Sequence, residues 1–140
     1  MQIRDHHFLA NPWSDPITFY ENLVHYKEGW AAAENNLGAA YHKRGDFDKA
    51  LEHYRAAIAL NGSIPDPHYN IARLLPYRKT GMPVQEVIYE LKRAIEIDPD
   101  YFLAYKYLGD VYAMLGDQEQ ADANHAKAEE IKNRNMHNAP

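Results

Sequence analysis

Histidine is the residue type of this chain with the widest chemical range, because imidazole binds metals and exchanges protons near neutral pH. The sequence holds eight histidines, and His6 and His7 are neighbours. Adjacent residues do not form the i, i+4 pair that shares a helix face, and no cysteine or paired acidic residue accompanies them at ligand spacing. The histidines therefore predict no metal site.

Catalytic motifs are missing from the sequence as well. There is no G-x-S-x-G, no H-E-x-x-H and no glycine-rich phosphate loop. Cysteine is absent, which excludes a thiol nucleophile, a disulfide framework and a cysteine-based zinc site. Glu34 and the pair Glu129-Glu130 fit solvated helix faces. We expect no enzyme and no cofactor.

The elements that must position any site come from an internal repeat. The block Leu37–Asp46, with the pattern L-G-x-x-Y-x-x-x-G-D, returns 71 positions later as Leu108–Asp117. Ala50 and Ala57 return at the same offset as Ala121 and Ala128. A middle copy begins 34 residues after the first at Ile71-Ala72-x-x-Leu75 and closes three residues late, with Leu91-x-x-Ala94 and Pro99. Repeats of this length stack into a solenoid, so function is expected on a surface.

The repeated residue types have a physical role. Small residues such as Gly38 and Ala50 allow helices to approach closely, and Tyr41 and Tyr54 fill the space between helix pairs. Each Gly-Asp pair interrupts the chain, glycine through positive φ and aspartate as the N-cap of the next helix. The pattern predicts pairs of antiparallel helices.

Together these positions resemble the tetratricopeptide repeat, a helix-turn-helix unit. The resemblance implies an all-α, right-handed α-solenoid with repeats at 31–64, 65–101 and 102–135. Residues 1–29 would form an irregular segment and a capping helix, the second helix of a truncated repeat, and 136–140 a frayed tail. About seven helices are expected, at 16–27, 31–43, 47–60, 66–75, 83–97, 101–114 and 118–132.

In this family the first helix of each pair lines a concave groove that binds peptides. Carried over, the first repeat contributes Asn35, Asn36, Ala39, His42 and Lys43. The second repeat contributes Tyr69, Asn70, Arg73 and Tyr77. The third contributes Leu103, Lys106, Tyr107 and Asp110. The resemblance thus implies a module that binds an extended peptide or partner segment.

Asn36 and Asn70 occupy one repeat position, 34 residues apart. A carboxamide both donates and accepts hydrogen bonds, so a row of them can hold a peptide backbone, as similar asparagines do in this family. Tyr107 stands where a third asparagine would continue the row. The alternative is that both asparagines are ordinary polar residues on a solvated face.

The groove residues include Lys43, Arg73 and Lys106 against Asp110 alone, which favours an acidic or C-terminal segment as ligand. The two-carboxylate clamp of the chaperone-binding subgroup is not expected. Asn70 fits one clamp position, but Asn35, Ala39, Leu103 and Tyr107 replace the Lys, Asn, Lys and Arg that the clamp requires.

Two further features have alternative interpretations. The basic loop 77–82 after Leu75-Pro76 is either a tolerated surface insertion or a contact loop that flanks the groove and presents Tyr77, Arg78 and Lys79. His125 replaces the aromatic that is Tyr54 in the first repeat, which we attribute to an exposed last helix rather than to a site.

Composition limits the partner class. The formal net charge is −5, which disfavours nucleic acid and anionic membranes. No apolar run approaches membrane-spanning length, and Met1 is not followed by a signal-peptide pattern, so no direct membrane insertion is expected. The sequence leaves the compartment open.

Two other functions compete with peptide binding. Apolar Leu115, Ile131 and Met136 near the C-terminus make self-association through open solenoid ends plausible. Alternatively, the segment 11–16 (N-P-W-S-D-P) before a tetratricopeptide array resembles the junction in membrane glycosyltransferases of the protein O-mannosyltransferase kind. The chain would then be a docking or regulatory tail displayed outside the cytoplasm.

Overall fold

The computed structural model describes residues 15–26, 30–77 and 83–139. Within these ranges it contains seven α-helices, one 3₁₀ helix and no strand. The fold class is therefore all-α, a helical-repeat architecture, as the sequence predicts. The expected irregular segment before residue 15 and the expected contact loop at 78–82 lie outside the described residues.

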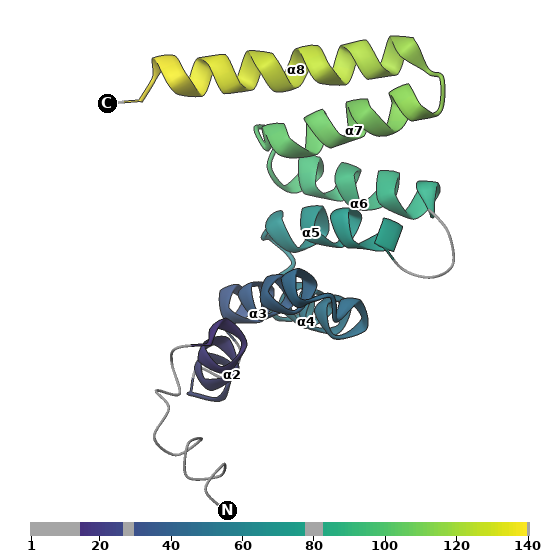
Figure 1. Cartoon of the computed structure of the whole chain (residues 1–140). Coiled ribbons are helices and arrows are strands. Elements are labelled where there is room, and N and C mark those ends of the chain that lie inside the picture. Colours follow the sequence, from purple (N-terminus) through teal and green to yellow (C-terminus); the bar gives the residue numbers. More distant parts are fainter. Residues whose placement is uncertain (1–14, 27–29, 78–82, 140) are drawn as a thin grey trace, which may run out of the picture. The chain divides into compact units, whose positions relative to one another are not determined.

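The chain divides after Asn61 into two compact units, and the described part of the first holds three helices. They are α2 (Pro16–Tyr26), α3 (Ala31–Arg44) and α4 (Phe47–Leu60) (Figure 1). Asp15 caps α2 by accepting a hydrogen bond from the Thr18 backbone N–H at 3.0 Å. The Tyr41 hydroxyl of α3 donates to Glu21 of α2 at 2.8 Å, and Ile17 of α2 is buried. Helix α2 thus packs on α3, as expected for a capping helix.

The turn between α3 and α4 depends on a glycine. Gly45 has a φ of 92°, in the left-handed region that favours glycine, and the Asp46 N–H donates to the Tyr41 carbonyl at 2.9 Å. The predicted positive φ is confirmed. Asp46 stands at the N-cap position of α4, but its side chain makes no capping hydrogen bond and lies 3.4 Å from Arg44 instead.

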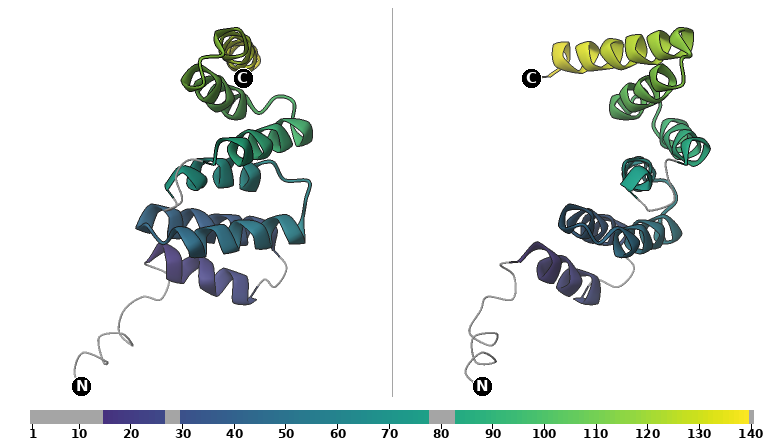
Figure 2. Two further views of the ribbon diagram at one scale, coloured as in Figure 1. Left: turned by 90° about the vertical axis from the view of Figure 1, so that its right-hand side faces the viewer. Right: turned by 45° about the vertical axis from the view of Figure 1, so that its right-hand side comes forward.

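The second unit holds the remaining elements. They are α5 (Asp66–Leu74), the 3₁₀ helix η1 (Leu75–Tyr77), α6 (Val84–Ile97), α7 (Phe102–Met114) and α8 (Gln118–His137). Within this unit the helices follow one another in chain order, as the further views also show (Figure 2). Its core consists of buried side chains from all four α-helices, which include Leu74, Val87, Leu91, Val111 and Ile131.

The turn between α7 and α8 also contains a glycine with positive φ, like the turn between α3 and α4. Gly116 has a φ of 81°, and the Asp117 side chain accepts from the Gln120 backbone N–H at 3.1 Å. Here the predicted glycine turn and aspartate cap are both present. The early end of α5 also follows the prediction, because Pro76 cannot continue an α-helix and the chain forms η1 instead.

The last helix is longer than the sequence indicated. We expected it to end near Lys132, with a polar tail after it, but α8 continues to His137. No glycine or proline interrupts residues 133–137, and the Arg134 guanidinium bonds to Asp100 at 3.2 Å. The expected boundary was wrong because weak helix formers such as asparagine do not by themselves stop a helix.

Candidate functional site on α5 and α7

Arg73 lies on α5 one turn after Tyr69, so the two side chains share a helix face. The guanidinium carbon lies 5.7 Å from the centroid of the Tyr69 ring, a cation–π geometry. Arg73 is exposed and forms no ion pair with any carboxylate of the described ranges. The arrangement presents an oriented cation that forms no ion pair with the described residues.

Tyr69 also contacts the chain just before α7. Its ring centroid lies 5.5 Å from that of Tyr101, with an interplanar angle of 57°. The Tyr101 hydroxyl donates to Asp66 at 2.6 Å. Burial raises the pKa of both Tyr69 and Tyr101, and the bond to Asp66 raises that of Tyr101 further. Both phenols therefore remain protonated at neutral pH.

Tyr107 links α7 to α5. Its hydroxyl donates to the Ala72 carbonyl at 3.4 Å, a long hydrogen bond. Burial is the largest cause that raises the pKa of Tyr107, and the nearby Tyr77 and Tyr69 raise it further. The tyrosine that replaces a third asparagine in the expected row is thus part of an aromatic cluster.

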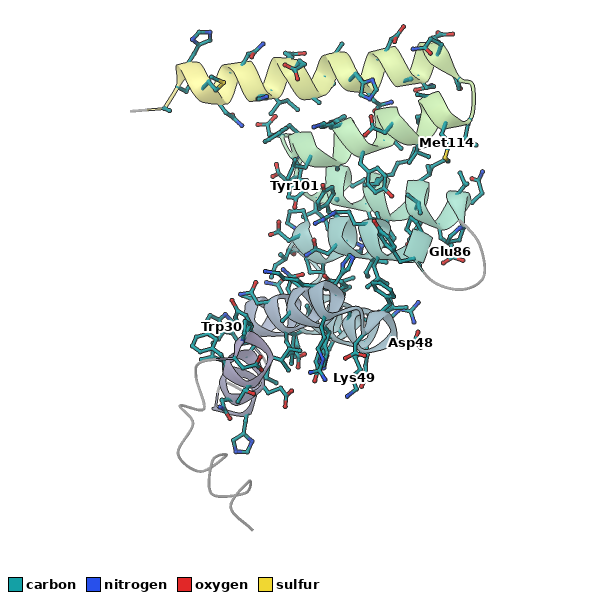
Figure 3. All side chains as sticks on the ribbon, in the orientation of Figure 1. Trp30, Asp48, Lys49, Glu86, Tyr101 and Met114 are labelled. Atoms are coloured by element: carbon teal, nitrogen blue, oxygen red, sulfur yellow. The ribbon has the colours of Figure 1, made fainter. Side chains whose placement is uncertain are left out.

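The outward side of α7 continues this surface. Lys106 is exposed and has no interaction partner among residues 15–26, 30–77 and 83–139. Leu103 and Met114 are 39% and 57% exposed, and Tyr77 on η1 is 64% exposed. Tyr101 and Met114 lie at opposite ends of α7 (Figure 3). We call this surface the α5–α7 face and define it by Tyr69, Arg73, Tyr77, Leu103, Lys106 and Tyr107.

Asp110 was also expected in the groove. Its carboxylate lies 2.8 Å from Nε2 of His125 on α8. Asp110 therefore has a partner on α8, but its side chain is exposed and its charge raises the pKa of Tyr69 and Tyr107. Arg73 and Lys106 form no ion pair within the described part of the chain.

A hollow of about 320 Å³ adjoins the face at the start of α7. Its lining residues are Asp66, Asp98, Asp100, Tyr101, Phe102, Leu103 and Asn135. The carboxylates are engaged internally, since Asp66 accepts from Tyr101, Asp98 from the Asp100 N–H and Asp100 from Arg134. Sequence reasoning did not identify this hollow, which depends on the unexpected length of α8.

The site residues expected in the first unit all lie on α3. Asn36 and Lys43 are exposed and contact no partner within the described ranges, and Asn35 is half-buried. Asn70, half-buried on α5, belongs to the second unit. The alignment of Asn36 with Asn70 stays a prediction.

Two histidine–carboxylate pairs were missed at the sequence level. Glu34 and His53 join α3 to α4 at 2.7 Å, and His68 and Glu90 join α5 to α6 at 2.6 Å. The partners exchange positions between repeats, since His68 follows Glu34 by 34 residues and Glu90 follows His53 by 37. This exchange of histidine and glutamate between the two helices of a repeat was the feature of the sequence that could have revealed both pairs. His68 is buried, so this pair is structural.

His125 occupies the place that Tyr54 fills in the first repeat. A Cβ added to Gly38 would lie 2.6 Å from the Tyr54 ring, and one added to Gly109 would overlap the His125 ring. We attributed His125 to an exposed last helix, but its ring also has a structural role, because it packs on Gly109 and forms a hydrogen bond with Asp110.

Clustered metal ligands or a membrane-spanning helix would indicate other function classes. In the described ranges no three His, Cys, Asp or Glu side chains are grouped so that they could hold a metal ion. None of the helices in these ranges has the length and apolar character needed to cross a membrane.

Two family models match the chain. The tetratricopeptide repeat model covers residues 31–63, which hold α3 and α4, and a second TPR repeat model covers 85–116. The second match spans most of α6 and all of α7, across the repeat boundary expected at 101 and 102. The division into repeats therefore stays a prediction.

Curated relatives include the protein CTR9 homolog of Arabidopsis thaliana, 31% identical over 90 residues, and the inactive TPR repeat-containing thioredoxin TTL3 of the same plant, 33% identical over 86. These matches cover 61% of this chain but only 8% and 12% of the relatives.

Solved structures agree on the fold. A crystal structure of MamA matches with a TM-score of 0.73 and 23% identity, over 86% of this chain and 68% of that one. TTC0263, a thermophilic TPR protein of Thermus thermophilus, matches with a TM-score of 0.73 and 21% identity, over 84% and 64% of the two chains. The two repeat models and the helices that they cover show that the chain contains tetratricopeptide repeats.

Proposed function

We propose that the chain is a non-catalytic module that binds an extended segment of a partner protein on the α5–α7 face. Tetratricopeptide repeats are protein–protein interaction units, and this face carries exposed apolar, aromatic and cationic side chains on the first helices of two expected repeats. Aromatic residues and arginine are the types that contribute most at protein interfaces.

The observation that carries the proposal is the state of Arg73. Its guanidinium rests on the Tyr69 ring and forms no ion pair with any carboxylate of the described ranges. A stacked arginine loses less side-chain freedom when a carboxylate binds, so the site is preorganised for an acidic group. Lys106 adds a second cation that has no ion-pair partner among the described residues, and an acidic partner segment fits both.

The residues of the first unit extend this proposal. Asn36 and Lys43 on α3 are exposed, and they stay predicted peptide contacts of the first unit by itself. The proposal does not depend on them, because the cluster on α5 and α7 lies within one unit.

Association through the end of α8 has less support. Ile131, expected among the apolar residues of an open end, is fully buried, and most exposed side chains of α8 are polar or charged. A polar outer helix is typical of a capping element. The transferase-tail hypothesis stays a prediction, and residues 11–14 of its motif lie outside the described residues.

The test is affinity capture from lysate of the source organism with three chains. They are wild type, Tyr69→Ala/Arg73→Ala, and the control Tyr89→Ala/Lys92→Ala, which removes an exposed tyrosine and an exposed lysine from α6. We expect a partner that wild type and control retain and the face variant loses. Retention of every partner by the face variant, with its helix content intact, would contradict the proposal.

A further inference from the structure

The orientation of Arg73 depends on contacts that begin at the other end of α5. Asp66, Tyr69 and Arg73 follow one another at spacings of three and four residues, so their side chains share one face of this helix. The first of the three is a carboxylate, the second an aromatic ring and the third the cation of the α5–α7 face.

The Tyr69 ring is the support of Arg73. The guanidinium carbon lies 5.7 Å from the ring centroid. The Tyr69 hydroxyl has no hydrogen-bond partner among residues 15–26, 30–77 and 83–139, so packing rather than a polar contact holds the ring. Because a free arginine side chain samples many rotamers, a support that moved would leave the cation unoriented. What fixes the Tyr69 ring therefore also fixes Arg73.

Tyr101 is the aromatic residue that packs against Tyr69, with ring centroids 5.5 Å apart and an interplanar angle of 57°. Its backbone is anchored at the N-cap position of α7. There its N–H donates to the Asp98 carbonyl and its own carbonyl accepts from the Ala104 N–H, both at 3.1 Å. The orientation of the Tyr101 ring then depends on the contacts of its side chain.

Asp66 provides the polar contact of that side chain. The Tyr101 hydroxyl donates to the Asp66 carboxylate at 2.6 Å, across 35 positions of the sequence. A hydrogen bond to an ionised acceptor is stronger than one between neutral groups. Tyr101 is thus attached to one face of α5 twice, at Asp66 through its hydroxyl and at Tyr69 through its ring.

We propose that Asp66 and Tyr101 are positioning residues of the α5–α7 face, which hold the Tyr69 ring so that Arg73 is oriented for a carboxylate of the partner segment. This role rests on the proposed function and assigns it two residues that touch no ligand themselves. A purely structural role, which joins α5 to the start of α7, would stabilise the chain without affecting Arg73.

The side-chain signals of Arg73 distinguish these two roles in the free, isotopically labelled chain. The ring current of Tyr69 shifts the Nε–H signal, and relaxation of this group reports how well the side chain is ordered. Tyr101→Phe keeps the ring and the net charge but removes the hydroxyl. We expect the Arg73 signal to move toward that of an unstructured arginine and its order to fall. The control Tyr41→Phe removes a similar bond, to Glu21 at 2.8 Å in the first unit, and should leave Arg73 unchanged.

Two changes at Asp66 separate the hydrogen bond from the charge. Asp66→Ala and Asp66→Asn remove the same negative charge, but only asparagine keeps an acceptor oxygen for the Tyr101 hydroxyl. We expect Asp66→Ala to loosen Arg73 as Tyr101→Phe does, and Asp66→Asn to retain the wild-type signals. Unchanged Arg73 signals in both Tyr101→Phe and Asp66→Ala would overturn the positioning role, whatever these variants do to stability in urea.

An end-capped fluorescent peptide of repeated Glu-Gly-Ser is the binding probe, followed by anisotropy on the full chain. We expect Tyr101→Phe to weaken its binding about threefold, because an arginine that is not held in place loses more side-chain entropy on binding. Arg73→Ala should weaken it further.

The outcomes separate the positioning role from the proposed function. Probe binding that depends on Arg73 but is indifferent to Tyr101→Phe overturns the positioning role and leaves the proposed function in place. Probe binding that is indifferent to Arg73→Ala contradicts the proposed function, and the Arg73 signals of the free chain then still decide whether Tyr101 orients this side chain.

Discussion

At the scale of single residues, two glycines determine how closely paired helices approach. The Tyr54 ring lies against Gly38, with a built Cβ only 2.6 Å away, and the His125 ring lies against Gly109. Neither glycine is required for its backbone angles, since both lie inside helices. Their role is to leave room for the ring on the partner helix.

We expect Gly38→Ala to lower the free energy of unfolding. Overpacking costs about 1–3 kcal/mol, and the better helix propensity of alanine returns up to about 1 kcal/mol, so a net loss of roughly 1 kcal/mol follows. Urea denaturation measures it. In a Tyr54→Leu background the ring is gone and the penalty should shrink, and an unchanged penalty would show that the ring is not the cause.

Tyrosine ionisation provides a second test at this scale. Burial and the bond to Asp66 raise the pKa of Tyr101 above its ordinary value of 10.0. The unfolded chain therefore ionises first, so this contribution to stability is complete below pH 10 and is lost as pH rises further.

Denaturation midpoints at several pH values from about 9 to 11 should fall with pH, and less steeply in Tyr101→Phe. The pKa values of Tyr69 and Tyr107 are also raised in the folded chain. Tyr101→Phe should therefore reduce the dependence of the midpoint on pH without abolishing it. An identical slope in wild type and Tyr101→Phe would mean that Tyr101 is not buried as described.

At the scale of elements, α8 is the helix that the sequence describes least well. Its last part, Asn133–His137, consists of exposed polar residues and Met136, and Arg134 connects it to Asp100 in the turn before α7. This long-range contact orients the extension and helps to form the hollow at the start of α7.

Arg134→Ala should therefore fray the end of α8 while the rest of the chain stays folded. Both partners of the pair are exposed, so the loss of global stability should stay below about 1 kcal/mol. Hydrogen exchange is the measurement, with faster exchange expected in the wild-type-protected amides of residues 134–137. Equal exchange in both chains would indicate that the extension does not depend on this contact.

Periodicity and turn residues predicted most of the helices to within one or two positions. Gly45, Gly116 and Pro76 are local signals with local effects, so one sequence suffices to interpret them. The end of α8 and the hollow require a contact between residues 34 positions apart, which no local pattern reveals.

The candidate site was predicted in part. The family resemblance identified Tyr69, Arg73, Lys106 and Tyr107, but it could not indicate that Asp110 is occupied by His125 or that Tyr101 joins the cluster. Both contacts join side chains of different helices. The sequence separation between such partners differs from one repeat to the next, so it cannot be taken from the repeat pattern.

At the scale of the whole molecule, each end of a repeat array needs either a partner or a polar cover. Helix α8 covers its neighbour with Ala121, Ala128 and Ile131 and exposes mainly Glu, Gln, Asn, Lys and Arg side chains. Met136, 67% exposed, is its largest apolar surface residue.

We therefore expect no self-association through α8. Sedimentation velocity over a wide concentration range should give one monomeric species for wild type and for Met136→Lys. A dimer that forms in wild type and disappears in Met136→Lys would show that α8 is an interface.

The central claim is that the α5–α7 face binds the partner, and chemical-shift mapping tests it most directly. A captured partner segment is titrated into isotopically labelled chain while the ring signals of Tyr69 and Tyr107 and the guanidinium signal of Arg73 are followed. We expect these signals to shift first and to saturate together, while the signals of Tyr89 on α6 do not shift. Movement confined to α4, α6 or α8, with Tyr69 and Arg73 unchanged, would contradict it.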